Sequence, residues 1–291
     1  MVANIIDINQ LSFSKLNFEG LKTLVQWADA EGWNPGAQDA EVFWATDPDG
    51  FYGYFMDGNL IAGGSIVAYD KAFGFMGFFI VKKEYRSMGI GRRLWHQRRD
   101  MLLSRLSPGA SIGMDGVLAM QPFYQQGGFE IAFRDERHEK TGMTCHVNPA
   151  ISTIIQSDTE SILAFDKQCF GFARPKFLLS WLAMSGIKTF KYVDKDVLKG
   201  FAIVRKAGTG YKICPLFADN SMVAEELYKA CLNAVPGEPV YIDIPVVNTA
   251  AVALLKQYHT NYIFECARMY YGKAPNMAID KVFGITTFEL G

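Results

Sequence analysis

The sequence lacks a long apolar segment. No stretch reaches the roughly 18 consecutive apolar residues that a membrane-spanning helix needs. Residues 1–10 also lack the basic start and apolar core of a secretory signal. We therefore expect a soluble, cytoplasmic protein that has no membrane partner.

Histidines and paired cysteines are also scarce. The 291 residues include four histidines and five cysteines, and no two cysteines form a Cys-x-x-Cys pair. None of the ligand spacings typical of zinc sites is present, so we expect no metal. Cysteines that are far apart and odd in number are typical of reduced thiols buried as small apolar side chains.

Net charge is almost absent as well. There are 29 Lys and Arg residues against 30 Asp and Glu, which gives a formal charge of -1. Proteins that bind nucleic acid usually carry a basic field, so no nucleic-acid partner is expected. The basic residues are unevenly spread, because eight of the 14 in the first 148 residues lie between Lys82 and Arg105. This distribution indicates one local anion site.

What the sequence does contain is a large apolar content and a repeated order of elements. Hydrophobic residues make up 49% and aromatic residues 14% of the chain, which excludes a disordered protein. Periodicity predicts helices at 19–30 and 91–106 and strands at 52–56, 60–68, 74–81, 111–114 and 129–133 in the first half. After Asn148-Pro149 a similar order returns, with strands at 188–193, 200–204, 211–216 and 240–244 and helices at 221–234 and 249–258. We predict two tandem domains, 1–148 and 149–291, of a mixed α+β class in which helices flank a mostly antiparallel sheet.

A glycine-containing turn follows the strand at 74–81. Gly89 and Gly91 stand where the next helix begins, and glycine allows backbone N–H groups to approach an anion closely. Arg86 and Arg92 add guanidinium groups that pair with phosphate. A P-loop motif is missing, and so is the third glycine of the dinucleotide fingerprint. The pattern predicts a pyrophosphate site, and an ordinary strand-to-helix turn with a solvated basic face is the alternative.

The run Arg86-Ser87-Met88-Gly89-Ile90-Gly91 resembles motif A of the GNAT superfamily of N-acetyltransferases. It matches the motif's Arg/Gln-x-x-Gly-x-Gly/Ala pattern at every specified position. The resemblance implies that acetyl-CoA is the co-substrate, with loop amides on its pyrophosphate and the strand backbone along its pantetheine arm. The cofactor-binding residues that it implies are Phe79, Ile80, Val81, Arg86, Ser87, Met88, Gly89, Ile90, Gly91 and Arg92.

A second motif, Gln121 to Phe129, is similar to the closing helix of that family and its Phe-Tyr-x-x-x-Gly-Phe signature. The resemblance implies that Tyr124 protonates the departing CoA thiolate. A phenol suits this role because it keeps its proton at neutral pH and donates it once a thiolate forms nearby. The alternative is an aromatic side chain that only packs the helix against the sheet.

The general base and the acceptor site are less clearly marked. The strand at 74–81 contains no carboxylate, so Asp115 at the end of the next strand is the candidate base. Asp39, Glu41 or a chain of water molecules are the alternatives. The resemblance places the acceptor beside the loop after the first helix, where Trp33, Asn34 and Asp39 are the candidate substrate residues, with packing and turn capping as their structural alternatives.

The second half does not keep the phosphate loop. Met222 and Ala224 stand where the first half has its two loop glycines, and Glu225 and Glu226 replace the arginines that follow. A carboxylate at a helix start repels an anion, so this half should not bind CoA. It resembles a degenerate acetyltransferase-like domain, which we expect to cover the acceptor cleft of the first.

The sequence therefore predicts an acetyl-CoA-dependent N-acetyltransferase. It would transfer an acetyl group to the primary amine of a small molecule by direct attack in a ternary complex, because none of the cysteines lies in the motif regions. A non-catalytic acyl-CoA-binding sensor or regulatory module is the alternative, and a nucleotide-dependent enzyme is a third possibility.

Overall fold

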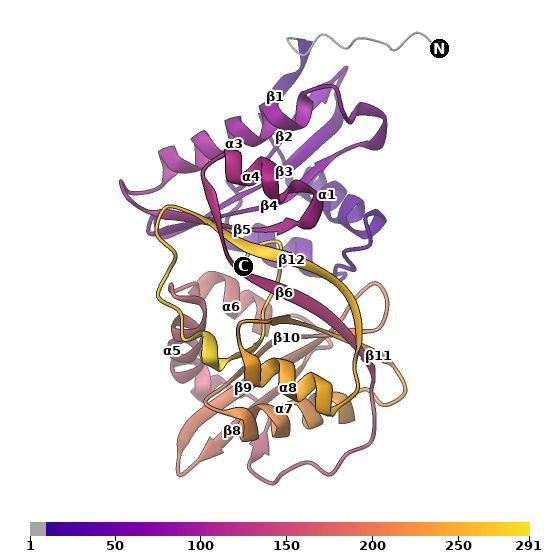
Figure 1. Cartoon of the computed structure of the whole chain (residues 1–291), viewed down its shortest axis with the longest axis vertical. Helices are drawn as coiled ribbons and strands as arrows, with labels where there is room; N and C mark the ends of the chain where they lie inside the picture. Colours follow the sequence, from indigo (N-terminus) through magenta and orange to yellow (C-terminus); the bar gives the residue numbers. More distant parts are fainter. Residues whose placement is uncertain (1–9) are drawn as a thin grey trace.

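A computed structural model describes residues 10–291, and Figure 1 shows the two halves stacked along the long axis of the molecule. Thirteen strands within these residues form one sheet with the order β1-β2-β3-β4-β5-β12-β6-β11-β10-β9-β8-β7, and β13 pairs with β10. Most pairings are antiparallel. The predicted α+β class, with two similar halves, is confirmed.

The first half follows the predicted order closely. Its elements are β1 (Ser12–Lys15), α1 (Phe18–Ala30), α2 (Asp39–Thr46), β2 (Phe51–Met56), β3 (Asn59–Tyr69), β4 (Phe73–Val81), α3 (Ile90–Arg105), β5 (Ser111–Val117), α4 (Gln121–Gln126) and β6 (Phe129–Thr141). Two differences stand out: α2 was not predicted, and β6 continues far beyond the predicted strand end at Phe133.

The second half contains β7 (Ile151–Ser152), α5 (Thr159–Phe170), α6 (Pro175–Leu182), β8 (Lys188–Asp194), β9 (Val197–Lys206), β10 (Tyr211–Ala218), α7 (Ser221–Asn233), β11 (Pro239–Pro245), α8 (Thr249–Gln257), β12 (Asn261–Tyr271) and β13 (Val282–Gly284). The sequence predicted this order up to α8, with helices expected at 159–165 and 176–184 for α5 and α6. It predicted neither β12 nor β13, which carry the chain back toward the first half.

Local sequence explains several element ends. The Asn17 side chain caps α1 by accepting a hydrogen bond from the Gly20 amide at 2.9 Å. The β2–β3 turn contains Asp57 and Gly58 at φ 49° and 77°, the left-handed region that a tight hairpin requires. This turn and the one at Asp70 and Lys71 bring β2, β3 and β4 together as an antiparallel meander.

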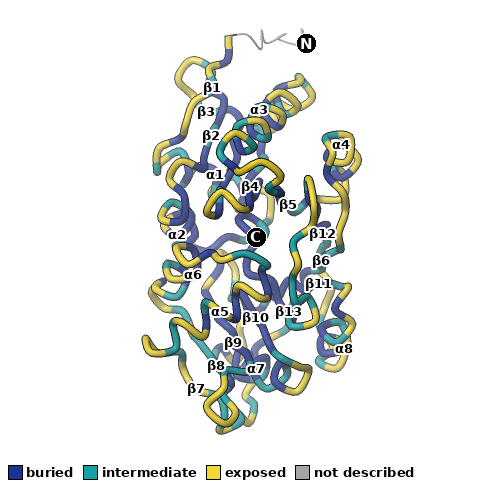
Figure 2. Tube along the Cα trace, turned by 90° about the vertical axis from the view of Figure 1, so that its left-hand side faces the viewer, coloured by how far each residue is buried: buried dark blue, intermediate teal, exposed yellow. Residues whose placement is uncertain are grey.

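The core extends across both halves. Helix α3 packs on β3 and β4, while α1 and α2 contribute to a second core on the opposite side. That second core continues into the other half, because Phe43 of α2 stacks on Trp181 of α6 at 6.4 Å. Figure 2 shows the buried strands running through the middle of the molecule and exposed residues at its outside.

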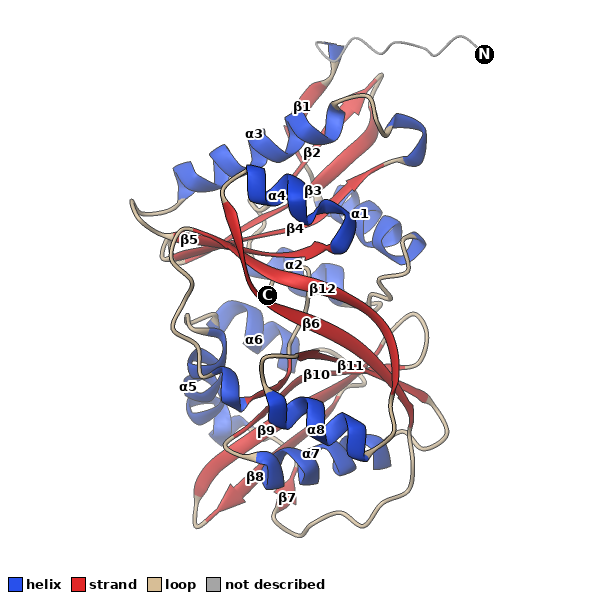
Figure 3. Ribbon diagram, viewed as in Figure 1, coloured by secondary structure: helices blue, strands red, loops and turns tan. Residues whose placement is uncertain are grey.

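The two halves exchange strands. Strand β12 lies between β5 and β6 and pairs antiparallel with both, so a strand near the end of the chain completes the first-half sheet (Figure 3). In return the later part of β6, from Asp135 to Thr141, pairs with β11 of the second half. Each half therefore depends on the other for its sheet, although the chain boundary near residue 148 remains a prediction.

None of the helices between residues 10 and 291 has the length and apolarity that a bilayer crossing requires.

Candidate active site

The central feature of the first half is a fork between β4 and β5. The two strands pair in parallel only from Phe73–Ser111 to Met76–Met114. Beyond that point Phe78 and Phe79 oppose the single residue Gly64, which makes a bulge in β4. Phe78 takes φ 49° there, a conformation that a phenylalanine rarely adopts. The edge of β4 after Met76 consequently faces an opening instead of another described strand.

A cavity of about 680 Å³ occupies this opening. Its lining includes nine of the predicted site residues: Trp33, Phe79, Ile80, Val81, Arg86, Ser87, Gly91, Asp115 and Tyr124. Met88, Gly89, Ile90 and Arg92 belong to the adjacent loop and helix start without lining the cavity, and Ile90 is fully buried. The structure therefore brings the predicted cofactor loop and the candidate acid together at one opening.

The predicted phosphate loop wraps around the start of α3. Ser87 and Gly89 have φ values of 63° and 81°, and Gly89 precedes the helix without any side-chain cap. A Cβ on Gly91 would lie 3.4 Å from Phe79 and Val81, so the loop sits directly on the end of β4. The first-turn amides of α3, which no intrahelical carbonyl accepts, are left for an anion.

Arg86 braces this loop. Its Nε donates to the Val81 carbonyl at 2.8 Å, and its Nη2 pairs with Glu31 at 2.5 Å. The side chain thus links the loop to the end of β4 and to the end of α1. In this arrangement Arg86 fixes the shape of the predicted phosphate loop, and the start of α3 supplies free N–H donors.

Tyr124 is held rigidly beside the fork. It is 4% exposed and stacks on Trp95 of α3 with ring centroids 6.3 Å apart. Phe79 meets the same ring edge-on at 6.3 Å. Burial raises the pKa of the Tyr124 phenol, against the opposing effect of Arg98, so the hydroxyl stays protonated. It is therefore a proton donor that borders the cavity.

The comparisons with known proteins agree with this geometry. The family model described as "Acetyltransferase (GNAT) family" matches residues 18–129, and one described as "Acetyltransferase (GNAT) domain" matches residues 162–284. Together they cover well over half of the chain. The chain belongs to the GNAT superfamily of acetyltransferases. Its duplicated units are both GNAT domains.

Several proteins resemble this GNAT chain along most of its length. It is 29% identical over 271 residues to the holothin acyltransferase of Pseudoalteromonas sp., covering 91% of this chain and 90% of that protein. It is 22% identical to an uncharacterized N-acetyltransferase, YitH, of Bacillus subtilis, covering 81% and 83%. A putative acetyltransferase from Pyrococcus horikoshii has the same fold with a TM-score of 0.83 at 21% identity, covering 99% and 98%. A tandem GNAT protein from the clavulanic acid biosynthesis pathway has a TM-score of 0.63 at 13% identity, covering 91% and 99%.

Asp115 borders the cavity of this GNAT domain but is tied to another strand. Its two oxygens accept from Nε and Nη2 of Arg268 on β12 at 2.7 and 2.9 Å. Burial raises the pKa of the Asp115 carboxyl to about 6, although Arg268 opposes this. Asp135 and Cys266 lie beside it, with ligand atoms within 4.8 Å of one another. Arg268 takes both Asp115 oxygens, so Asp115 is held in an ion pair in this structure.

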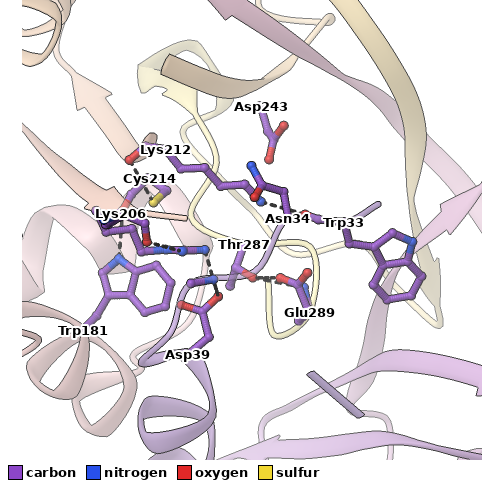
Figure 4. A network of polar contacts seen from close by, with 12 residues as sticks. Trp33, Asn34, Asp39, Trp181, Lys206, Lys212, Cys214, Asp243, Thr287 and Glu289 are labelled. Atoms are coloured by element: carbon purple, nitrogen blue, oxygen red, sulfur yellow. Dashed lines mark hydrogen bonds and ion pairs between the residues drawn. The ribbon is translucent and has the colours of Figure 1, made fainter. Parts of the chain in front are cut away.

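The predicted acceptor loop contributes one residue to the cavity. Trp33 lines it, and the Trp33 carbonyl accepts from Arg137 and Lys212, each at 3.0 Å. Asn34 instead bonds the Thr209 amide at 2.8 Å. Asp39 is 1% exposed and has Arg205 as its counter-ion at 2.9 Å, in the place of an acceptor ammonium (Figure 4). Asn34 and Asp39 thus attach the loop to the second half and lie outside the cavity lining.

Sequence reasoning missed the part of the cavity that the second half supplies. Phe264 and Cys266 of β12 line it, together with Phe288 and Glu289 near residue 291. The second half thus supplies one side of the cavity. The sequence did not assign these four residues to the site, because β12 and the chain after β13 bring them there only in the folded protein.

Proposed function

We propose that the first GNAT domain is an acetyl-CoA-dependent N-acetyltransferase that acts on the primary amine of a small molecule. The observation that carries the proposal is the fork between β4 and β5, which has an uncapped helix start at one end and Tyr124 at its side. The enclosed acceptor side supports a small acceptor. The relative from Pseudoalteromonas is named for acyl transfer to holothin.

We assign each step of the proposed reaction to a part of the fork. The amides from Ser87 to Arg92 hold the CoA pyrophosphate, and the free edge of β4 from Phe79 to Val81 pairs with the pantetheine arm. The thioester carbonyl lies at the bulge, where backbone N–H groups polarise it. The amine attacks that carbon from the Trp33 side. As the C–S bond breaks, Tyr124 donates its proton to the thiolate.

Asp115 has a structural role at the fork in this proposal. Its bidentate pairing with Arg268 joins β5 to β12 where β5 leaves β4. Both carboxylate oxygens are engaged, so we assign Asp115 to holding the fork open, which leaves the proton of the amine to another group.

The test is direct. Calorimetry measures acetyl-CoA binding, and thiol release measures turnover with a panel of primary amines. Binding followed by turnover supports the enzyme. Binding without turnover on any amine favours the non-catalytic sensor, and tight binding of ATP without binding of CoA favours a nucleotide-dependent enzyme.

The role of Tyr124 has its own test. Tyr124→Phe should lower kcat about 100-fold, the usual contribution of a general acid, and leave the acetyl-CoA Kd unchanged. Tyr228→Phe is the matched control, because Tyr228 is 1% exposed in the core of the second half. Equal losses of kcat and of affinity in the Tyr124 variant would mean that the ring only packs.

A further inference from the structure

The chain after β13 crosses from the second half to the first. Beyond Gly284 it lies against β3 and β4, where Tyr69 donates its hydroxyl proton to the Leu290 carbonyl at 2.8 Å. A Cβ on Gly77 would lie 2.0 Å from the Glu289 carbonyl oxygen, so the glycine just before the bulge makes room for this crossing. Residues 286–291, the crossing segment, therefore form one wall of the fork at the site of the reaction.

The crossing segment brings Glu289 into the cavity. Three carboxylates line the cavity, Glu31, Asp115 and Glu289. Glu31 is paired with Arg86 and Asp115 with Arg268. Glu289 has no ion-pair partner among residues 10–291, although it is only 5% exposed. It is the carboxylate of the three that remains available to a bound molecule.

One oxygen of Glu289 is held and the other is open. The Thr287 hydroxyl donates to Oε2, and the Glu289 amide donates to the Thr287 oxygen at 3.2 Å (Figure 4). Oε1 accepts no hydrogen bond from the described part of the chain, yet Oε1 is not a fully enclosed atom. The turn around Thr287 thus fixes the orientation of the carboxylate and leaves Oε1 unengaged, on a residue that lines the cavity.

The buried carboxylates near Glu289 have arginine partners. Asp39 pairs with Arg205, Asp243 with Arg137 and Asp115 with Arg268. Lys212, whose Nζ donates to the Trp33 carbonyl, is a further buried cation in this region, and Arg98, which donates to the Gly77 carbonyl at 2.7 Å, is another. Burial lowers the pKa of Lys212 to about 8, while Asp243 and Glu289 favour its charged form. Lys212 therefore offsets the charge of Glu289, and the acceptor side has no surplus negative charge with which to attract an ammonium ion.

Aromatic rings make up much of the same side. Trp33 and Phe78 stack at 6.5 Å with an interplanar angle of 30°. Phe264 and Phe288 meet edge-on at 5.8 Å. The Arg137 guanidinium lies over both of the latter rings, at 4.7 and 5.5 Å, and holds them in place. Such walls favour a flat ring, which stacks or packs edge-on against them.

From these contacts we propose that Glu289 is the general base and that the acceptor is an amine carried directly on a flat aromatic or heteroaromatic ring. This rests on the proposed function, since it names the base and the acceptor class of that reaction. An aryl amine is neutral at pH 7, so it needs no anionic site to bind. Its nitrogen bonds to the thioester carbon, and one N–H proton moves to Glu289 Oε1. The C–S bond then breaks, and the thiolate takes the Tyr124 proton. The products are the aryl amide and CoA thiol.

The base is tested with Glu289→Gln, which keeps the size of the side chain and removes its basicity. We expect kcat/KM for aniline to fall about 100-fold, the usual contribution of a general base, with an unchanged Kd for acetyl-CoA. Glu130→Gln is the matched control, because Glu130 is exposed on β6, and it should behave as wild type. Formate should restore turnover to Glu289→Ala.

The acceptor class is tested with three amines of similar size. Aniline is flat and neutral, benzylamine is flat but protonated at pH 7, and cyclohexylamine is neither flat nor neutral. We expect kcat/KM to fall in that order.

Two results would overturn the inference and leave the proposed function intact. One is a Glu289→Gln variant with wild-type turnover of aniline, and the other is cyclohexylamine reacting as fast as aniline. If Glu289→Gln also loses affinity for acetyl-CoA, the formate experiment on Glu289→Ala is the deciding test. Failure of formate to restore turnover there would contradict the role of Glu289 as the base. If the wild type releases no thiol with any amine, the proposed function itself fails.

Discussion

The same helix begins in two different ways in the two halves. In the first half Gly89 precedes α3 at φ 81° and has no side chain to cap the helix. In the second half Asn220 caps α7, and its side chain accepts from the Val223 amide at 3.1 Å. The donors that one half leaves for a phosphate are satisfied internally in the other. The half that lacks the phosphate-loop glycines thus has a conventional helix cap at the same place.

The two forks differ in the same sense. Strands β4 and β5 separate after Met76 and leave a cavity. Strands β10 and β11 pair in parallel from Tyr211 to Ile213, and β13 then pairs with β10 at Leu216 and Phe217. The Ile285 amide also donates to the Asp243 carbonyl of β11 at 2.8 Å. The second fork is therefore filled by the chain itself, which continues from there into the first half as the crossing segment.

This contrast explains what the second half contributes. It has lost the phosphate loop and the open fork, yet its strand β12 completes the first-half sheet and the crossing segment closes the acceptor side. We infer that the second half acts as a scaffold. Its contribution to the reaction is limited to the residues of β12 and the crossing segment that line the cavity of the first half.

The largest expected effect comes from breaking the exchanged strand. Arg268→Met leaves Asp115 buried without its partner, which should lower the free energy of unfolding by about 3–5 kcal/mol. Asp115→Asn in the same chain removes the unpaired charge and should recover most of that loss. Urea denaturation of the single and double variants measures both. An equal loss of unfolding free energy in the single and double variants would show that the unpaired charge of Asp115 is not the cause of the destabilisation.

The next effect distinguishes the two helix starts. Gly89→Glu places a carboxylate at the start of α3 and should weaken acetyl-CoA binding at least about 100-fold, or about 2.7 kcal/mol. Met222→Glu is the matched change at the start of α7, where the side chain is 53% exposed. It should leave the affinity unchanged. Calorimetry measures the acetyl-CoA Kd of both variants. An unchanged Kd for the Gly89 variant would mean that the CoA phosphates do not bind at the start of α3.

A smaller effect concerns the buried cation behind Trp33. The pKa of Lys212 is about 8 in the folded protein, below that of an exposed lysine, because burial disfavours its charge. Above about pH 8 the folded protein has lost this proton while the unfolded chain still holds it. The free energy of unfolding therefore rises with pH in this range. Wild type should gain about 1 kcal/mol relative to Lys212→Met between roughly pH 7 and 9. Denaturation at these pH values measures the gap, and a constant gap would contradict the lowered pKa.

The smallest effect sharpens the contrast between the two forks. Asn220→Ala removes the cap of α7 and should cost about 1 kcal/mol of stability. It should not create a second acetyl-CoA site, because β13 still fills the fork. Thermal unfolding and binding stoichiometry test the two parts, and a second equivalent of bound acetyl-CoA would show that the cap alone closes that half.

Some elements could not be predicted for identifiable reasons. Helix α2 has no clear apolar stripe in its sequence, because its buried face includes the polar residues Asp39 and Thr46 while the apolar Trp44 lies outside that face. Periodicity identifies a helix by the contrast between its faces, and here there is little contrast. The loop at Gly89 and the closing helix at Tyr124 were predictable because their chemistry depends on neighbours in the sequence.

The sequence by itself determined the parts whose physics is local. Alternation and turn residues set the meander, and the glycines before α3 set the uncapped helix start that suits an anion. Only the tertiary structure decided which strand completes each sheet, that Asp39 and Asn34 hold the halves together, and that Glu289 reaches the fork. These outcomes depend on contacts between residues more than a hundred positions apart, such as Arg268 with Asp115. No local pattern records such contacts, because a strand's pairing partner is chosen by burial of the whole sheet.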